Sequence, residues 1–169
     1  NQIKPVWVEL GLQTIHEKTA LKIRRGYPLS CFEQTVKELQ KRNIPVIVHI
    51  ILGLPGESTK EVLETIEYLN ALGIQGIKLQ LLHILKDTDL AKELPTLSLL
   101  SEEEYIALLL QCIAHLSPDI VIHRLTGDGP KELLLAPLWS LPKRHVLNRI
   151  AHQLKEEQVY QGMDYQKKK

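Results

Sequence analysis

The sequence of 169 residues is poor in cysteine, in aromatic residues and in net charge. Its two cysteines, Cys31 and Cys112, lie far apart, which excludes a disulfide framework and favours a reducing, cytoplasmic environment. The formal net charge of +1 argues against nucleic-acid binding through bulk electrostatics. No apolar run is long enough to span a bilayer, so we expect no membrane segment.

Several familiar catalytic motifs are missing as well. The chain contains no G-x-S-x-G elbow, no H-E-x-x-H pair and no P-loop lysine, so it shows no complete catalytic set of those types. What it has is a globular composition, with 44% hydrophobic and 24% charged residues. Its length suits one domain with a real hydrophobic core.

Apolar segments of strand type alternate with amphipathic helical segments along the chain. This order predicts βα units and the α/β class, with a parallel sheet of about four strands. Four strands are too few to close an eight-stranded barrel, so further chain or a second copy is expected to cover the sheet edges. Residues 86–100 form a connection without periodicity. Strands are predicted at residues 6–12, 46–52, 77–83 and 120–125, and helices at 14–24, 30–43, 58–72, 101–113 and 143–157.

Four of the predicted helices begin with the pattern S/T-x-x-E. In such a capping box, the hydroxyl and the carboxylate each satisfy a backbone amide that has no partner within the helix. Gly73 is well placed to end the helix at residues 58–72. The four predicted boxes are Thr14–Glu17, Ser30–Glu33, Ser58–Glu61 and Ser101–Glu104.

The most apolar predicted strand, residues 46–52, leads into the next helix through the turn Gly53-Leu54-Pro55-Gly56. Glycines at the carboxyl end of such a strand leave the backbone open at the edge where α/β proteins bind ligands. The same pattern also occurs in ordinary strand-to-helix turns, so this stretch alone is compatible with both interpretations.

Each predicted strand also carries polar residues, although a strand covered on both faces should be almost entirely apolar. A buried polar group without a partner costs about 1–3 kcal/mol, so this recurrence predicts a shared polar cavity on one side of a curved sheet. By alternation, Glu9, Gly11 and Gln13 share one side of the first strand and its exit, and His49, Ile51 and Gly53 share one side of the second. In the third strand, Lys78 and Gln80 share a side and His83 lies on the other. In the fourth strand, His123 and Arg124 lie on opposite sides.

Three stretches occur in order: VELGLQT at residues 8–14, IRRGY at 23–27 and HIILGLPGE at 49–57. Together they resemble the carboxyl-terminal half of a radical S-adenosylmethionine (SAM) enzyme. A fourth, RLTGDGP at 124–130 with APLWSL at 136–141, resembles bacterial radical SAM proteins of unassigned substrate that are related to the elongator catalytic subunit.

The resemblance implies a fold, two domains and two cofactors. Residues 1–130 would form half of a partial (β/α)6, TIM-like barrel, and residues 131–169 a C-terminal helical extension and tail. The cofactors would be SAM and one [4Fe-4S] cluster, which cleaves SAM reductively to a 5′-deoxyadenosyl radical. In the family this radical then acts on the substrate.

The resemblance also assigns cofactor-binding residues. Glu9 and Gln13 would lie where the family contacts the ribose and amino-acid portion of SAM. Arg25 would lie where a basic residue approaches the SAM carboxylate. Ile51 and Gly53 would match the motif that lines the adenine.

The adenine motif departs from the family pattern G-x-I-x-G-x-x-E at two positions. His49 stands at the first glycine, and the glutamate falls one place late, at Glu57. The shift puts Glu57 in doubt as an adenine or structural contact, whereas Ile51 and Gly53 still fit the pattern.

The family holds its cluster with three cysteines in a C-x-x-x-C-x-x-C run, and this chain contains no such run. Cys31 and Cys112 cannot replace it. We therefore expect the cluster ligands outside this chain, in the amino-terminal half of the barrel, and a fragment that is inactive alone.

The sequence does not indicate the substrate. The candidate determinants of the substrate are residues 86–100 and the segment after Gly127, where Gly127-Asp128-Gly129 could contact phosphate or ribose.

Two other functions fit parts of the sequence. A metal-dependent hydrolase or lyase on a different parallel barrel would use Glu9, His49 and His123, although these residues show no diagnostic metal-ligand spacing. A non-catalytic interaction domain would use the basic helix at residues 143–157 to touch RNA or protein. Residues 131–169 hold eight Lys or Arg against four Asp or Glu, and their last three lysines are expected to form a solvated tail.

Overall fold

The computed structural model describes residues 3–127 and 129–166. The predicted loop contact at Asp128 and the predicted tail at residues 167–169 lie outside this part of the chain. Within it, no helix has the length and apolar character needed to cross a membrane. The elements in chain order are β1 (Val8–Gln13), α1 (Glu17–Lys22), α2 (Leu29–Lys41), β2 (Val46–Leu52), α3 (Thr59–Leu72), β3 (Gly76–Leu81), β4 (Ile84–Leu85), α4 (Asp89–Glu93), η1 (Leu94–Thr96), α5 (Glu102–His115), β5 (Val121–Arg124), η2 (Lys131–Leu133), β6 (Leu134–Ala136), η3 (Leu138–Ser140) and α6 (Lys143–Glu156), where η marks a 3-10 turn.

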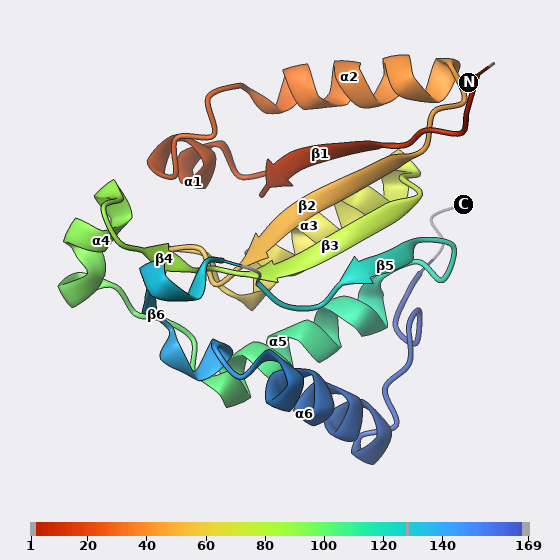
Figure 1. Ribbon diagram of the computed structural model, residues 1–169. Coiled ribbons are helices and arrows are strands. Elements are labelled where there is room, and N and C mark those ends of the chain that lie inside the picture. The colour runs from red at the N-terminus through yellow and green to blue at the C-terminus, as the bar shows by residue number, and fades with distance from the viewer. Residues whose placement is uncertain (1–2, 128, 167–169) are drawn as a thin grey trace.

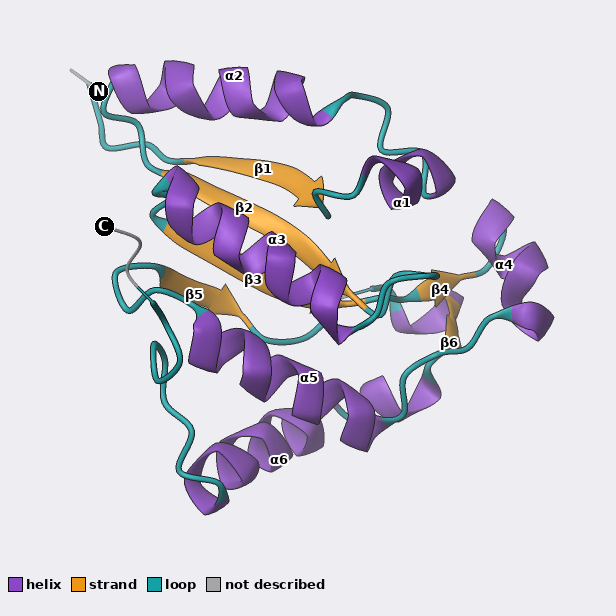
Figure 2. Ribbon diagram, turned by 180° about the vertical axis from the view of Figure 1, so that it is seen from behind, coloured by secondary structure: helices purple, strands orange, loops and turns teal. Residues whose placement is uncertain are grey.

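Four parallel strands form one sheet in the order β1-β2-β3-β5. Figure 1 shows that the sheet is curved, with α2, α3 and α5 along its outer side and the other side open toward the viewer. Figure 2, seen from behind, shows α3 lying across the strands. The connections between parallel strands therefore run over the same face, as right-handed crossovers on a curved sheet do. The predicted α/β class with a four-stranded parallel sheet is confirmed.

The core lies between the sheet and these helices. In β2, Val48, Ile50 and Leu52 are at most 1% exposed. The apolar stripe of α3 meets them with Ile66 and Leu69, which are both fully buried. α5 carries more buried residues than α3 because it packs against the sheet on one side and against α6 on the other.

Two helices begin with the capping boxes that the sequence predicts. In α5, Ser101 Oγ accepts a hydrogen bond from the Glu104 amide at 3.1 Å, and Glu104 Oε2 accepts one from the Ser101 amide at 2.8 Å. Ser58 begins α3 in the same way. Gly73 ends α3 in the left-handed region with φ of 69°, also as predicted.

The other two predicted boxes, Thr14–Glu17 and Ser30–Glu33, are wrong. α1 and α2 both begin without a side-chain cap. The Glu17 carboxylate accepts a hydrogen bond from Arg25 Nη2 at 3.1 Å, and the Glu33 carboxylate accepts one from the Tyr68 hydroxyl at 2.8 Å. α1 begins after His16 and α2 begins after Pro28, so neither predicted pair occupies the N-cap and N3 positions of its helix.

The third strand and the long connection also differ from the prediction. β3 ends at Leu81, so His83 lies beyond the strand, and residues 86–100 contain α4 and η1. A second, antiparallel sheet pairs β4 with β6 and so joins residues 84–85 to residues 134–136. Strands of two or three residues are too short to show alternation in a sequence, so periodicity cannot predict them.

Ser101→Ala and Ser58→Ala are each expected to lower the free energy of unfolding by about 1 kcal/mol, because each removes the hydroxyl of a formed capping box. Ser30→Ala is the matched control, since α2 begins without a side-chain cap, and its effect should stay within ~0.5 kcal/mol. Urea denaturation followed by circular dichroism measures all three. Equal losses at Ser30 and Ser101 would contradict the assignment of the caps.

Candidate functional site

The end of β1 is shaped by a β-bulge. Gly11 pairs with His49 and Gln13 pairs with Ile50, so Leu12 is the extra residue in the ladder. Gln13 has φ of 62°, which is uncommon for a residue other than glycine. Its side chain folds back over Gly11, where a Cβ would lie only 2.5 Å from Gln13 Nε2. The bulge and Gly11 together therefore fix the direction of the Gln13 carboxamide at the carboxyl end of the sheet.

Arg25 holds this bend in place. Its side chain is 1% exposed, and Nη1 donates to the carbonyl oxygens of Thr14 and Leu12 at 2.8 and 3.3 Å. Nε donates to the Tyr27 carbonyl at 2.9 Å, and Nη2 donates to Glu17 Oε1 at 3.1 Å. Four of the five guanidinium N–H groups are thus used within the chain. Arg25 is therefore a brace for the loop that follows β1.

β2 ends in a turn that requires glycine. Gly53 has φ of 83° and Gly56 has φ of 92°, both in the region that side chains disfavour. A Cβ at Gly53 would also approach Leu100 Cδ1 to 3.0 Å. In the same turn, Glu57 Oε1 is buried and has no hydrogen-bond partner among the described residues. Gly53 therefore has a structural role that does not depend on a ligand.

A pocket of ≈ 740 Å³ lies beside the carboxyl ends of β1 and β2, between α1 and α4. Three of the predicted cofactor-binding residues line it together, namely Gln13, Arg25 and Ile51. Glu9 and Gly53 are not among its lining residues. Its other lining residues are Gly11, Ile23, Tyr27, Leu54, Leu82, Thr88 and Leu90, with Lys22, Arg24, Asp89 and Glu93 as charged groups.

Two ion pairs beside this pocket connect α4 to the last residue of α1 and to the segment that follows α1. Arg24 pairs with Asp89, and Lys22 Nζ lies 3.9 Å from Glu93 Oε2. All four side chains are exposed, so the pairs add little to stability. The contribution of α4 to the pocket was not predicted, because residues 86–100 show neither a motif nor a helical period.

Three neighbouring strands place polar side chains against one another on the open face of the sheet. Glu9 Oε2 accepts from Lys78 Nζ at 2.6 Å and from His49 Nε2 at 2.9 Å. His49 Nδ1 then accepts from Gln80 Nε2 at 3.3 Å, which suits the neutral tautomer protonated on Nε2. Hydrogen bonding from Lys78, and after it from His49, lowers the pKa of Glu9 to about 2. Polar residues of β1, β2 and β3 thus converge as alternation predicts.

β5 departs from the predicted alternation. Its ladder with β3 shifts between Ile77 and Lys78, so Lys78 pairs with Arg124 and His123 is an extra residue. The His123 ring lies against Gly76, where a Cβ would come within 2.6 Å of His123 Nε2. Because Gly76 and Lys78 alternate onto the same side of β3, His123 and Arg124 both lie on the open face. The prediction that they lie on opposite sides is wrong.

The fourth sequence motif folds around one histidine. The His83 ring lies against the backbone of Gly127 and Gly129, because a Cβ at Gly129 would be 2.9 Å from Nδ1 and one at Gly127 would overlap the ring. His83 Nε2 donates to Ser140 Oγ at 3.2 Å, and Ser140 Oγ donates to the Pro137 carbonyl at 2.8 Å. Residues 124–127 and 129–130 are therefore parts of one structural unit with residues 136–141.

The described residues contain no group of three or more His, Cys, Asp or Glu side chains that could hold a metal ion. Cys31 is exposed, whereas Cys112 is fully buried in the core, where burial raises the pKa of its thiol to about 12. A cluster held by three thiolates does not fit this part of the chain. The alternative metal site at Glu9, His49 and His123 is not supported by this geometry either.

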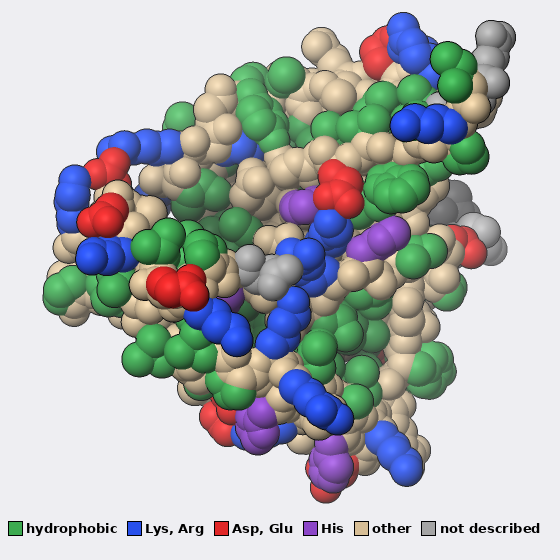
Figure 3. All heavy atoms as spheres, in the orientation of Figure 1, with side chains coloured by type: hydrophobic (Ala, Val, Ile, Leu, Met, Phe, Trp, Pro, Cys, Tyr) green, Lys and Arg blue, Asp and Glu red, His purple; other side chains and the backbone are tan. Residues whose placement is uncertain are grey.

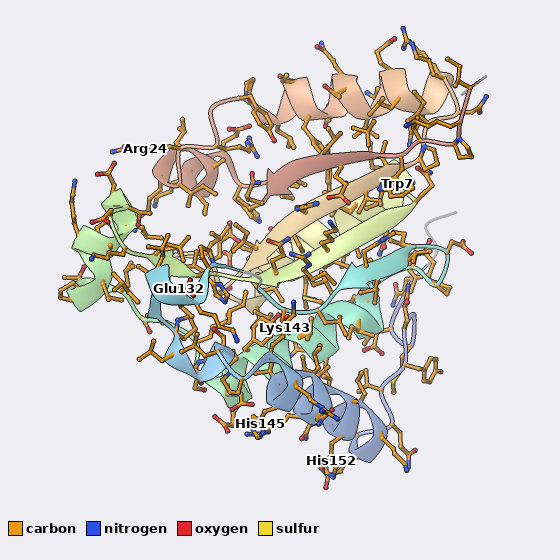
Figure 4. All side chains as sticks on the ribbon, in the orientation of Figure 1. Trp7, Arg24, Glu132, Lys143, His145 and His152 are labelled. Carbon is orange, nitrogen blue, oxygen red and sulfur yellow. The ribbon has the colours of Figure 1, made fainter. Side chains whose placement is uncertain are left out.

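The basic helix α6 is partly neutralised by α5. Arg149 Nη1 lies 3.0 Å from Glu103 Oε1 and 3.6 Å from Glu102 Oε2, and His145 lies 3.5 Å from Glu102 Oε1. Figure 4 shows His145 and His152 projecting from α6 away from the sheet. Part of the helix that was considered for RNA binding is thus engaged in packing on α5.

Residues 2–69 match the Radical SAM superfamily, and residues 74–156 match the Radical SAM C-terminal domain. The chain belongs to the radical SAM superfamily. The two matched regions include every strand of the four-stranded sheet and the residues that line the pocket. They also include the hydrogen-bonded polar cluster of Glu9, His49, Lys78 and Gln80 on the open face.

Curated relatives occur in bacteria and archaea. The uncharacterized protein YtqA of Bacillus subtilis is 42% identical over 169 residues, which is 99% of this chain and 52% of that protein. Protein YhcC of Escherichia coli is 40% identical over 136 residues, 79% of this chain and 44% of that protein. The uncharacterized protein MJ0486 of Methanocaldococcus jannaschii is 37% identical over 163 residues, 93% of this chain and 50% of that protein. The chain spans about half the length of the curated relatives it matches.

A solved structure shares the fold. An Elp3 of the archaeon Methanocaldococcus infernus, with an N-terminal deletion, matches with a TM-score of 0.79 at 15% sequence identity. The match covers 92% of this chain and 37% of that chain. The curved parallel sheet with outer helices therefore has the fold of a partial radical SAM barrel, as the sequence motifs predicted.

Glu9 is expected to titrate with a midpoint near pH 2, measured by NMR of its side-chain carboxyl carbon in the folded protein. Because this pKa lies below the ordinary 4.5, the contacts of Glu9 stabilise the fold above pH 4.5, and that contribution is lost as the pH falls from 4.5 toward 2. Lys78→Met removes the strongest partner and should move the midpoint upward. Arg42→Gln, at the C-cap of α2, is the control and should leave the midpoint unchanged. A midpoint near 2 in Lys78→Met would contradict the pairing.

Proposed function

We propose that this chain is the SAM-binding, carboxyl-terminal half of the barrel of a radical SAM enzyme. The observation that carries the proposal is the pocket shared by Gln13, Arg25 and Ile51 at the carboxyl ends of β1 and β2. Barrels and open α/β sheets bind ligands at this edge. The volume of ≈ 740 Å³ lies within the range of small-molecule sites.

The lining of the pocket suits an adenosine group. Ile51, together with Ile23, Leu54 and Leu82, offers an apolar wall for the adenine base. The Gln13 carboxamide offers donors and an acceptor for the ribose hydroxyls or the amino-acid portion of SAM. Gly53 would contribute the turn that ends this wall rather than a side chain.

We propose that Arg25 and Glu9 contact SAM through the N–H group and the carboxylate oxygen that their contacts within the chain do not use. Nη2 of Arg25 has one N–H beyond the four that brace the loop, and we assign it to the SAM carboxylate. Glu9 uses Oε2 for both Lys78 and His49, so we assign Oε1 to the amino group or ribose of SAM. The assignment of Glu9, which does not line the pocket, requires SAM to extend from the pocket toward Lys78 and His49.

The full-length protein would supply what this chain lacks. We infer that three cysteines outside this chain hold the [4Fe-4S] cluster, which when bound supplies the electron for cleavage of SAM, and that this chain alone is inactive. The relatives are about twice as long as this chain, which supports further chain in the full-length protein. We propose that this further chain is the amino-terminal half of the barrel and that it covers the open edge of β1. The extension at residues 131–169 and the cytoplasmic location stay predictions.

Ile51→Ala and Gln13→Ala are each expected to raise the Kd for SAM about tenfold, because each removes roughly 1.4 kcal/mol of contact. Equilibrium dialysis with labelled SAM measures the Kd in the full-length protein, reconstituted anaerobically with iron and sulfide. Val121→Ala is the matched control, because Val121 is 60% exposed at the opposite end of the same sheet face. Unchanged affinity in both pocket variants would reject the pocket as the SAM site.

SAM cleavage is tested on the same preparation with a low-potential reductant. The full-length protein is expected to form 5′-deoxyadenosine and methionine, measured by liquid chromatography with mass detection. This chain alone is expected to form neither. A full-length protein that lacks the three-cysteine run, or that holds a cluster and leaves SAM intact, would contradict the proposal.

A further inference from the structure

The open face of the sheet carries a concentration of positive charge beside the SAM pocket. Figure 3 shows lysine, arginine and histidine side chains following one another across this face toward α6. Lys78 of β3 and Arg124 of β5 are paired in register on adjacent strands. Figure 4 shows Lys143, the first residue of α6, pointing toward the same face.

The bulge in β5 creates the pairing of the two cations. In an uninterrupted ladder, His123 would pair with Lys78, and Arg124 would point to the helix-covered side of the sheet. The extra residue instead leaves His123 on the open face, against Gly76, and brings Arg124 beside Lys78. Bulges of this kind commonly redirect a side chain next to a functional site.

Two cations opposite each other on neighbouring strands are unfavourable for the fold. The Glu9 carboxylate, 2.6 Å from Lys78 Nζ, offsets part of this cost. The Lys78 side chain is only 13% exposed, so its charge acts through a medium that screens it less than bulk water does. Arg124 and Lys143 also interact with other groups of the chain. Two cations placed side by side on neighbouring strands, at a cost to stability, are suited to binding an anion.

We propose that Lys78, His123 and Arg124 bind an oxyanion of the substrate, a phosphate or a carboxylate. An arginine fork and a lysine ammonium are the side chains that bind both groups most strongly, and the imidazole adds a further donor. His49, which pairs with Lys78, lies two residues before Ile51, a distance of ~6.6 Å along a strand. The oxyanion would therefore lie next to the proposed SAM site. Its identification with the substrate rests on the proposed function, whereas the binding of the anion does not.

The test titrates the full-length protein with inorganic phosphate and, separately, with succinate, by calorimetry at low ionic strength. We expect saturable binding of at least one anion that weakens as salt is added. Arg124→Gln should raise its Kd at least ~tenfold, because a charge-assisted contact is lost. Lys78→Arg, which keeps the cation beside Glu9, should change it less than ~threefold. Arg42→Gln is the matched control, because Arg42 is an exposed arginine at the C-cap of α2, and it should leave the Kd unchanged.

The results show which kind of anion the site prefers and, separately, whether the anion binds at His123 and Arg124. Tighter binding of phosphate indicates a phosphorylated substrate, and tighter binding of succinate indicates a carboxylic acid. Anion-dependent shifts of the His123 ring signals, assigned with His123→Gln, locate the site by NMR in the unmodified protein if Arg124→Gln does not fold.

Two results would overturn the inference. One is that neither anion binds at low salt, and the other is that Arg124→Gln binds like the wild type while the His123 signals do not move. The Kd for SAM is measured in parallel and should be unchanged in Arg124→Gln. Failure of the wild type to bind SAM would reject the proposed function and leave the anion result standing.

Discussion

A buried guanidinium holds the end of β1 in the shape on which the candidate site depends. Arg25 binds the carbonyl oxygens of Leu12 and Thr14, on either side of Gln13, and so keeps Gln13 in a conformation that few non-glycine residues adopt. The same guanidinium lies 5.2 Å from the centre of the Tyr27 ring, another residue of the pocket wall. If Arg25 were lost, the bulge could relax, and the carboxamide of Gln13 would leave the pocket.

The regular and irregular parts of the sheet have different roles. The central ladder, between β2 and β3, is uninterrupted over six residue pairs, and it carries the most buried part of the core. Both outer ladders are bulged. The bulge in β1 directs Gln13 toward the proposed SAM pocket, and the bulge in β5 brings Arg124 beside Lys78. A regular, buried centre thus lies between two bulged ladders at which side chains are redirected.

Much of the fold could be predicted from the sequence, because it depends on local patterns. The apolar strands, their alternation with helices, and the capping boxes at Ser58 and Ser101 all follow from spacing within a few residues. The box predicted at Glu17 failed because α1 begins at Glu17 itself, with His16 as the N-cap, and the carboxylate binds Arg25 instead. The sides of His123 and Arg124 were mistaken because a bulge shifts the alternation without leaving a sequence signal.

The candidate site was predictable in part for the same reason. Family motifs identified Gln13, Arg25 and Ile51, and these three line one pocket. The motifs did not reveal that the guanidinium of Arg25 is largely used within the chain, since a hydrogen-bond count requires coordinates. They also did not indicate α4, whose short helix contributes to the pocket from a stretch with no periodic signal.

The central claim is that SAM lies with its adenine against Ile51. The most direct measurement is an intermolecular nuclear Overhauser experiment on the full-length protein, with isoleucine methyl groups labelled and SAM added to saturation. We expect contacts from the adenine protons to the Ile51 methyl groups and none to Ile66, which is buried on the inner face of α3. Saturable SAM binding without an adenine contact at Ile51 would contradict it.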